Sequence, residues 1–150
     1  MRPGTAMLLG WLALAVPPLA SAALGGDATS VEADRAQMKA QARAATPAAG
    51  YTMQEFELPS GTLVREFLST QGKVFAVSWH GPSVPDLRTT LGAYFEPFIA
   101  AAQGHRHGHH PLYVRQPDLV VQSTGHARSF AGRAYVPSLL PPAFSVDAIQ

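Results

Sequence analysis

The stretch YTMQEFELPSGTLVREFLSTQGKVFAVSWHG, residues 51–81, decides the fold. It holds three runs rich in β-branched and aromatic residues, and the breaks between them fall at residues 59–61 and 70–72. Each break supplies a glycine for a positive φ angle, so the stretch predicts a three-stranded antiparallel meander. In the third run, residues 74–79, both sets of alternating side chains are largely apolar, which predicts a strand at the centre of the sheet.

Upstream of the meander, residues 29–45 predict a helix. Thr29 can act as its N-cap, because Glu32 follows at the capping-box position. The apolar stripe is thin, and Thr46-Pro47 is expected to end the helix; the stripe consists of Val31, Met38, Ala42 and Ala45. With so little apolar surface to bury, we expect this helix to be either loosely docked or mobile.

Downstream of the meander, residues 82–103 predict a second helix. Ser83 is a candidate N-cap with Asp86 three residues later. Apolar side chains then recur at spacings of four, four and three, enough to cover a sheet: Leu87, Leu91, Phe95 and Phe98. Because Pro97 lies inside this pattern, we expect a kink or a stop near residues 95–96.

The rest of the chain completes the expected sheet. Residues 101–117 are expected to be a connector, and residues 119–136 predict a hairpin that turns around Gly125. The tail is expected to wrap the surface, with a helical turn near residues 145–147. The order of helix, three strands, helix and two strands predicts an α+β protein, with an antiparallel sheet of about five strands and helices packed on one face.

The first residues read as a secretory signal peptide. A single basic residue precedes a short apolar run, two prolines and small residues that end in Ala20-Ser21-Ala22. The run is shorter than the roughly 20 residues that a membrane span needs. We therefore expect an exported, periplasmic or secreted protein with no stable membrane association after cleavage. The expected organisation is a signal peptide (1–23), an N-terminal helix and linker (24–50), a single α+β domain (51–140) and a C-terminal tail (141–150).

Composition excludes several classes of protein. Ten of the 11 Lys and Arg residues follow residue 23, against ten Asp and Glu, and this balance argues against nucleic-acid binding. The chain has no cysteine, which rules out thiol catalysis, disulfide exchange and a zinc site with cysteine ligands.

The segment GHRHGHH, residues 104–110, is the one candidate metal site, with ligands His105, His107, His109 and His110. Alternating imidazoles can share one side of an extended segment and bind zinc, copper or nickel. Two glycines, Pro111 and the lack of a carboxylate within the run instead favour a solvated loop with weak, adventitious affinity. A periplasmic metal-binding protein stays as the alternative function.

Two further segments are candidate binding surfaces. SWHGP, residues 78–82, places Trp79 and His80 where a central strand meets a helix N-terminus, a favourable place for an anion. The plainer interpretation has Trp79 in the core and His80 exposed. In the second hairpin, four side chains surround Gly132: Arg128, Phe130, Arg133 and Tyr135. If this strand lies at a sheet edge it could receive another chain by strand addition. In the plainer interpretation it is an ordinary sheet edge that the arginines protect.

The sequence gives only a weak signal for a catalytic site. Ser123 or Ser129 can be combined with His126 and Asp118, and His80 is another candidate base, but no nucleophile elbow of the G-x-S-x-G type occurs. A hydrolase stays a remote alternative. We expect a non-catalytic accessory or binding protein, with no catalytic residue, no cofactor beyond weakly held zinc, copper or nickel, and a protein partner that the sequence does not identify.

Three long blocks resemble a family of small exported bacterial proteins known only as a domain of unknown function. They are LGGDATSVEADRAQM (24–38), PSGTLVREFLSTQGKVFAVSWHGPSVPDLRTTLGAYF (59–95) and QPDLVVQSTGHARSFAGRAYVPSLLP (116–141). The resemblance spans nearly all of the chain after the signal and implies an exported, single-domain protein. The histidine run lies outside these blocks. The family has no assigned activity, so the resemblance transfers no catalytic residue.

Overall fold

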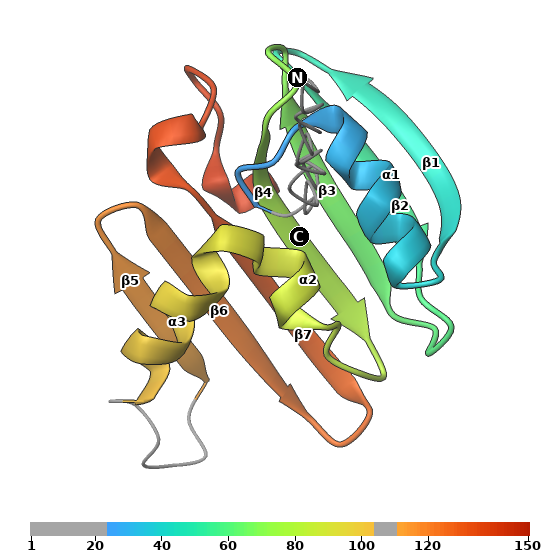
Figure 1. Ribbon diagram of the computed structural model, residues 1–150, viewed down its shortest axis with the longest axis vertical. Coiled ribbons are helices and arrows are strands. Elements are labelled where there is room, and N and C mark those ends of the chain that lie inside the picture. Colours follow the sequence, from blue (N-terminus) through green and yellow to red (C-terminus); the bar gives the residue numbers. More distant parts are fainter. Residues whose placement is uncertain (1–23, 104–110) are drawn as a thin grey trace, which may run out of the picture.

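The computed structural model describes residues 24–103 and 111–150, in which the chain forms a seven-stranded antiparallel sheet with helices on one face (Figure 1). The α+β class is therefore confirmed. The expected signal peptide and the histidine run lie outside the described residues. The strands are β1 (Gln41–Ala48), β2 (Tyr51–Glu57), β3 (Leu63–Ser69), β4 (Val74–Gly81), β5 (Leu112–Gln116), β6 (Leu119–His126) and β7 (Ser129–Tyr135).

The strand order is β1-β2-β3-β4-β7-β6-β5. The meander β2–β4, the central position of β4 and the hairpin β6–β7 are all confirmed. Gly61 and Gly72, in the two breaks of the meander, have φ angles of 86° and 75°, as the turns require. The expected sheet of about five strands is too small, because β1 and β5 extend it at its two edges.

The first correction concerns β1. The helix α1 (Ala28–Gln37) ends eight residues before the expected Ala45, and the alanine-rich segment after it pairs with β2. Pairing along a whole strand outweighs the helix propensity of alanine, which contributes only tenths of a kcal/mol per residue. The N-cap is also different: the Asp27 carboxylate accepts hydrogen bonds from the backbone N–H groups of Thr29 and Ser30, so Thr29 is inside the helix.

The second correction concerns β5, which lies within the expected connector. Its ladder partner is β6, with Val114 opposite Val121 at the middle of the pair. Pro111 and Pro117 flank β5, and so short a run between prolines carries little strand signal in the sequence. It is nevertheless an edge strand, where a neighbouring proline is tolerated.

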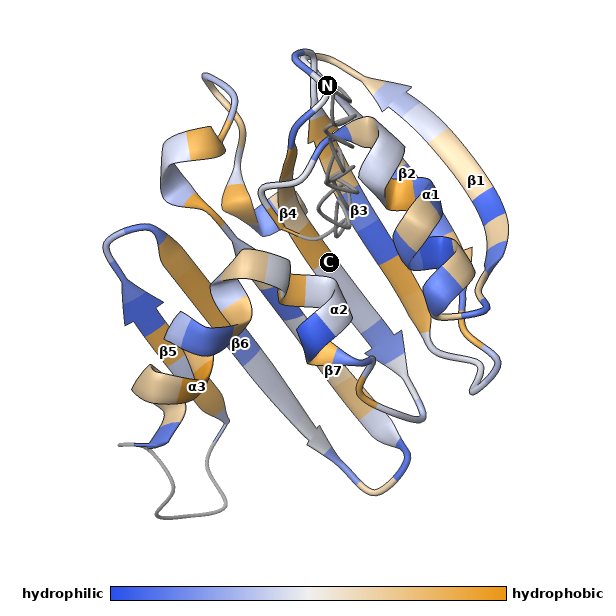
Figure 2. Cartoon of the chain, viewed as in Figure 1, coloured by the Kyte–Doolittle hydropathy of each residue, from blue (hydrophilic) through white to orange (hydrophobic). Residues whose placement is uncertain are grey.

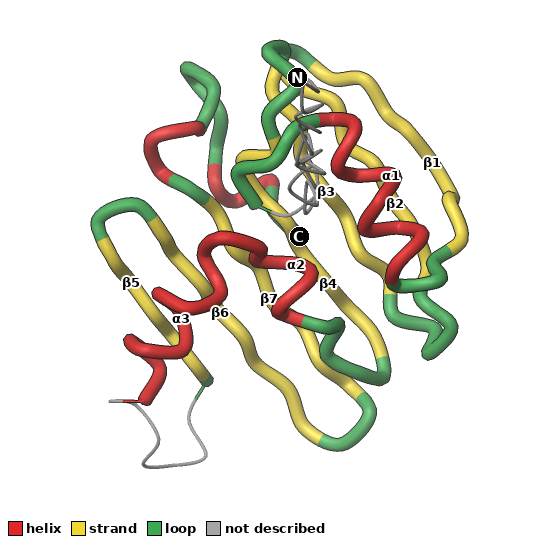
Figure 3. The backbone as a smooth tube through the Cα atoms, viewed as in Figure 1, coloured by secondary structure: helices red, strands yellow, loops and turns green. Residues whose placement is uncertain are grey.

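The second predicted helix is broken into α2 (Leu87–Leu91), a 3₁₀ turn η1 (Gly92–Tyr94) and α3 (Phe95–Ala102), and the chain changes direction between α2 and α3 (Figure 3). The expected break is real, but it precedes Phe95, and Gly92 has a φ of 50° there. Pro97 lies in the first turn of α3, where its missing N–H has no intrahelical acceptor to lose. The N-cap of α2 is Asp86, whose carboxylate accepts from the Arg88 N–H at 3.0 Å, and not Ser83.

The helices and the sheet enclose the main core. On that face Val77 and Trp79 of β4 pack with residues of β6 and β7 and with the buried side chains of α2 and α3, Leu91 and Phe98. Among the described residues, no helix is long and apolar enough to cross a membrane.

The opposite face of the sheet is covered in part by the C-terminal segment, which contains the 3₁₀ turns η3 (Pro137–Leu139) and η4 (Val146–Ala148). The expected helical turn near residues 145–147 is confirmed, with the Ser145 side chain as its cap. A bulge in β4 directs Phe75 and Ala76 into one cluster with Phe67 and Ile149, against which Tyr51 and Phe144 pack. The tail is therefore a second layer over one end of the sheet.

Candidate functional site

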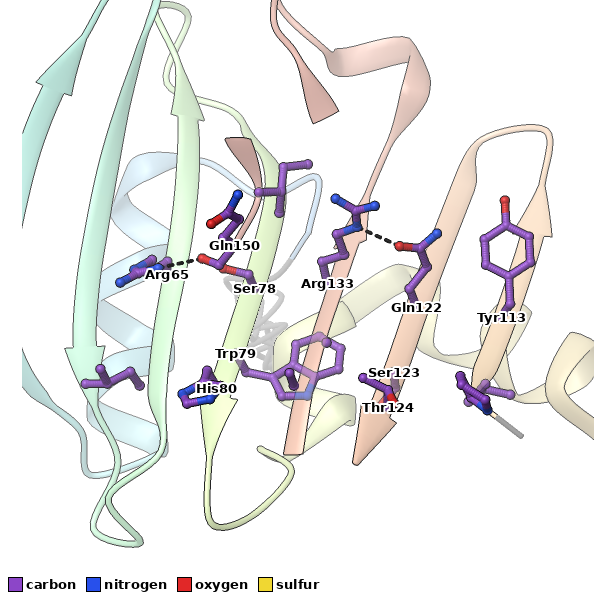
Figure 4. Close-up of a pocket in the computed structure, with 16 residues that line it drawn as sticks. Arg65, Ser78, Trp79, His80, Tyr113, Gln122, Ser123, Thr124, Arg133 and Gln150 are labelled. Atoms are coloured by element: carbon purple, nitrogen blue, oxygen red, sulfur yellow. Dashed lines mark hydrogen bonds between the residues drawn. The ribbon is translucent and has the colours of Figure 1, made fainter. Parts of the chain in front are cut away.

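The part of this second face that the tail leaves open forms a groove of about 700 Å³ (Figure 4). Residues from β3, β4, β5, β6 and β7 line it, and Ile149 and Gln150 of the tail form one wall. The groove lies where the strands change from apolar to polar residues. Apolar residues gather in the first halves of β4 and β6, and polar residues follow in their second halves (Figure 2).

A row of five polar or amphipathic side chains crosses the groove. Strand register places each residue opposite the next on five adjacent strands, in the order Arg65, Ser78, Arg133, Gln122 and Tyr113. At about 4.8 Å per strand, the row is about 19 Å long. Because side chains alternate between the two faces of a strand, a second row lies two residues away on the same face: Leu63, His80, Ala131 and Thr124.

One end of the polar row binds the tail. The main-chain oxygen of Gln150 accepts hydrogen bonds from Arg65 Nη1 at 2.6 Å and from the Ser78 hydroxyl at 2.8 Å. The charge of Arg65 is matched by Glu55 on β2, whose Oε2 lies 2.7 Å from Arg65 Nε. This half of the row is therefore already occupied.

The guanidinium of Arg133, in the middle of the row, has different partners from that of Arg65. Arg133 Nε donates to Gln122 Oε1 at 2.6 Å, and Arg133 Nη1 donates to the main-chain oxygen of Val146 at 2.9 Å. Both acceptors are uncharged. Arg133 forms no ion pair within residues 24–103 and 111–150, so its half-buried charge has no counterion there.

The structure separates the candidate surface residues. Arg133 and His80 lie in the groove, and Trp79 borders it while its indole belongs to the core on the helix side. Tyr135 packs under the tail, and Arg128 lies at the exposed turn between β6 and β7, where its φ is 65°. Phe130 lies opposite Gly81 on β4 and Gly125 on β6.

The idea that this strand receives another chain at a sheet edge is wrong for β7. It lies between β4 and β6, and both ladders are paired along its length. The edges of the described sheet are β1 and β5.

The hydrolase residues are not brought together as a triad. His126 and Ser129 are paired at the turn end of the β6–β7 hairpin, whereas Asp118 precedes β6 at its other end. Eight residues of extended chain separate Asp118 from His126, a distance of about 26 Å. The carboxylate of Asp118 instead accepts from Ser138 N–H at 3.2 Å and lies 3.5 Å from the Tyr94 hydroxyl.

Metal ligation rests on the histidine run alone. The four histidines of residues 105–110 lie outside the described residues, and within the described ones no group of three His, Asp or Glu side chains could hold a metal ion.

Sequence reasoning missed most of the groove, namely Arg65, Ser78, Gln122, Tyr113 and Gln150. Period-2 alternation could have placed Arg65 and Ser78 on one face of the meander, because their strands are consecutive. It could not place Arg133 beside Ser78, because the two residues are 55 positions apart in the sequence. Only the pairing register of β4 with β7 brings them together.

Fold and groove together define a class: an α+β protein whose antiparallel sheet carries helices on one face and a ligand-sized groove on the other. The chain belongs to the family of proteins of unknown function DUF2844, whose family model matches residues 20–149. No curated protein and no solved structure gives a significant match to the chain.

Proposed function

We propose that this protein is an exported, non-catalytic binding protein that holds a ligand in the groove on the helix-free face of the sheet. The observation that carries the proposal is the groove itself. Its volume of about 700 Å³ lies in the range of small-molecule sites, about 300–1,000 Å³. Apolar side chains and a few polar groups line it together, which is the usual composition of such sites.

The groove is built on rigid elements, which supports a binding role. Its floor consists of strands paired on both sides, apart from the edge strand β5. Its wall is fixed by the bonds from Arg65 and Ser78 to Gln150, and by the packing of Ile149, which is only 2% exposed. A preformed floor and wall lower the entropy lost on binding.

The test uses a neutral apolar fluorophore, N-phenyl-1-naphthylamine, titrated into the full chain. Ala131 lies on the groove floor between His80 and Thr124, so Ala131→Trp is expected to fill the groove and abolish the rise in fluorescence. Ala127→Trp, at the exposed hairpin turn, is the matched control and is expected to bind as the unsubstituted chain does. Equal binding by both variants would refute the groove as the site.

Export is part of the proposal and has its own test. The order of residues in 1–23 supports cleavage before Ala23, or before Leu24 at the neighbouring small-residue site. Mass spectrometry of the protein expressed with its native N-terminus should find the shortened chain in the periplasm or medium. Recovery of the full-length chain from the cytoplasm alone would contradict export.

Metal binding is the second candidate, favoured by four histidines within seven residues. Calorimetric titration with zinc, copper and nickel should compare the full chain with a variant in which His105, His107, His109 and His110 are all serine. Submicromolar, stoichiometric binding that the variant loses would establish this function. Tight binding must also raise the melting temperature, because the metal stabilises the native state.

A further inference from the structure

The charge of Arg133 points to a particular chemical class of ligand. A guanidinium carries five N–H donors, and the structure uses two of them on uncharged oxygens, Gln122 Oε1 and the main-chain oxygen of Val146. The side chain is half-buried, so its charge is only partly compensated by water. An anion at this place would supply the missing counterion.

The two arginines of the row differ in whether a carboxylate compensates their charge. Both arginines lie in the same row, on either side of Ser78. Arg65 has Glu55 as its ion-pair partner, whereas Arg133 has no carboxylate partner among the described residues. Side chains of the row already bind one hydrogen-bond acceptor, since Arg65 and Ser78 both donate to the main-chain oxygen of Gln150.

The groove also offers apolar contacts near Arg133, beside the polar side chains His80 and Thr124 of the second row. Ala131 and Leu63 lie in the neighbouring row, and Pro111 and Tyr113 border the groove at β5. Tyr113 is one of the large apolar side chains that stay exposed, at 44%. Arg133 lies two strands from Tyr113, so an apolar body of about 10 Å can lie across β6 and β5 while a charged head group reaches Arg133.

We propose that the groove binds an amphipathic carboxylate, with the carboxylate paired to Arg133 and an apolar chain or ring system lying on the Leu63–Ala131–Tyr113 side. This inference rests on the proposed function, because it names the ligand class of the same groove. Planar guanidinium and carboxylate groups match each other in geometry, and their charged hydrogen bonds are about twice as strong as neutral ones. The carboxylate can come from a free fatty acid or from an acidic apolar metabolite, and the two share this chemistry.

The test compares ligands of equal length but different head groups, below their critical micelle concentrations. Dodecanoate and dodecan-1-ol are each used to displace N-phenyl-1-naphthylamine from the full chain, and an aromatic acid, naphthalene-2-carboxylate, separates ring from chain ligands. Dodecanoate is expected to bind roughly tenfold or more tightly than dodecan-1-ol, because only the carboxylate pairs with Arg133. Preference for the naphthoate over dodecanoate would assign a ring-bearing acid, and the reverse preference a fatty acid.

Substitutions then locate the effect. Arg133→Gln is expected to remove the advantage of dodecanoate over dodecan-1-ol, Arg133→Lys to keep part of it, and the control Arg128→Gln at the hairpin turn to keep all of it. The head-group comparison on the unsubstituted chain needs no variant, so it decides the case even if Arg133→Gln fails to fold. Fluorophore binding with equal affinities for acid and alcohol would overturn the carboxylate inference and leave the groove as a site. Failure of the fluorophore itself to bind would overturn the proposed function.

Discussion

The indole of Trp79 lies against the backbone of Gly132, the residue opposite it on the neighbouring strand β7. A β-carbon built on Gly132 would lie 2.2 Å from Cζ2 and 2.4 Å from Cε2 of the indole. Trp79 is only 2% exposed and belongs to the core under the helices, so its ring has no open space to turn into. Gly132 is thus required by close packing, since its φ is not positive.

Replacing Gly132 with alanine should lower the free energy of unfolding by about 2–3 kcal/mol, the cost of overpacking a filled core. Urea denaturation of Gly132→Ala, Trp79→Leu and the double variant measures this. In the Trp79→Leu background the alanine is expected to cost less, because the two closest atoms belong to the indole and only the main-chain oxygen of Gln122, 2.8 Å from that β-carbon, stays in the way. Additive losses in the double variant would show that the indole does not set the requirement.

The two phenylalanines of α3 should differ in their contributions. Phe98 is 3% exposed within the main core, whereas Phe95 is half-buried and lies under the Arg88 guanidinium, whose Cζ is 4.3 Å from the ring centroid. Phe98→Ala is expected to cost about 3–5 kcal/mol, and Phe95→Ala about half as much. Thermal and urea unfolding of the two variants would contradict this if Phe95 proved the more costly position.

The parts of the fold that sequence predicts are those whose signals are local. The glycines at 61 and 72 and the alternation through residues 74–79 lie within the strands and turns that they define, and the meander follows from them. β1 is not predicted from the sequence because its alanines favour a helix in isolation. Only its pairing with β2 makes it a strand. Every residue of β1 is exposed, so no buried side chain marks it in the sequence.

The groove depends on register and not on local pattern. Arg133 and His80 were predicted as surface candidates, and both line the groove, but their neighbours come from strands far apart in the chain. Whether Arg133 faces Ser78 or the residue beside it depends on a single step of register, which turns every side chain to the other face. No spacing within one strand carries that information.

The C-terminal segment should depend on Phe144. Its ring makes edge contacts with Phe75, at 4.8 Å between centroids, and with Tyr51, at 5.1 Å. Phe144→Ala is expected to lower the free energy of unfolding by about 2–4 kcal/mol and to speed hydrogen exchange at the Ala148 and Ile149 amides. Phe144→Leu, which keeps most of the volume, is the control. Unchanged exchange in the alanine variant would mean that other contacts hold the tail.

The last prediction concerns a carboxyl group that is buried on the sheet. Glu66 of β3 is 2% exposed, lies opposite Gln54 of β2 and Val77 of β4, and has an acidic neighbour in Asp34 of α1. Burial, with a smaller contribution from the charge of Asp34, raises the pKa of Glu66 from its ordinary value of 4.5 to about 8. At neutral pH this side chain is therefore mainly protonated in the folded protein.

The pH dependence of stability follows from the protonation of Glu66 in the folded and the unfolded chain. Above pH 4.5 the unfolded chain loses the proton of Glu66, whereas the folded chain keeps it until about pH 8. Because the folded state binds more protons in this window, stability falls as the pH rises from 4.5 to 8 and levels off above it. The total loss is a few kcal/mol, since each unit of pKa shift corresponds to about 1.36 kcal/mol.

Glu66→Gln should remove this slope, because an amide of the same shape does not titrate. Urea denaturation at pH 5, 6, 7 and 8 should find the unsubstituted chain losing stability steadily and the variant losing much less. Glu96→Gln is the control: Glu96 is exposed and pairs with the exposed Arg88, so the profile of the variant should follow that of the unsubstituted chain within about 0.5 kcal/mol. Parallel profiles for Glu66→Gln and the unsubstituted chain would show that Glu66 ionises normally and that its contact with α1 has no effect on the pH dependence.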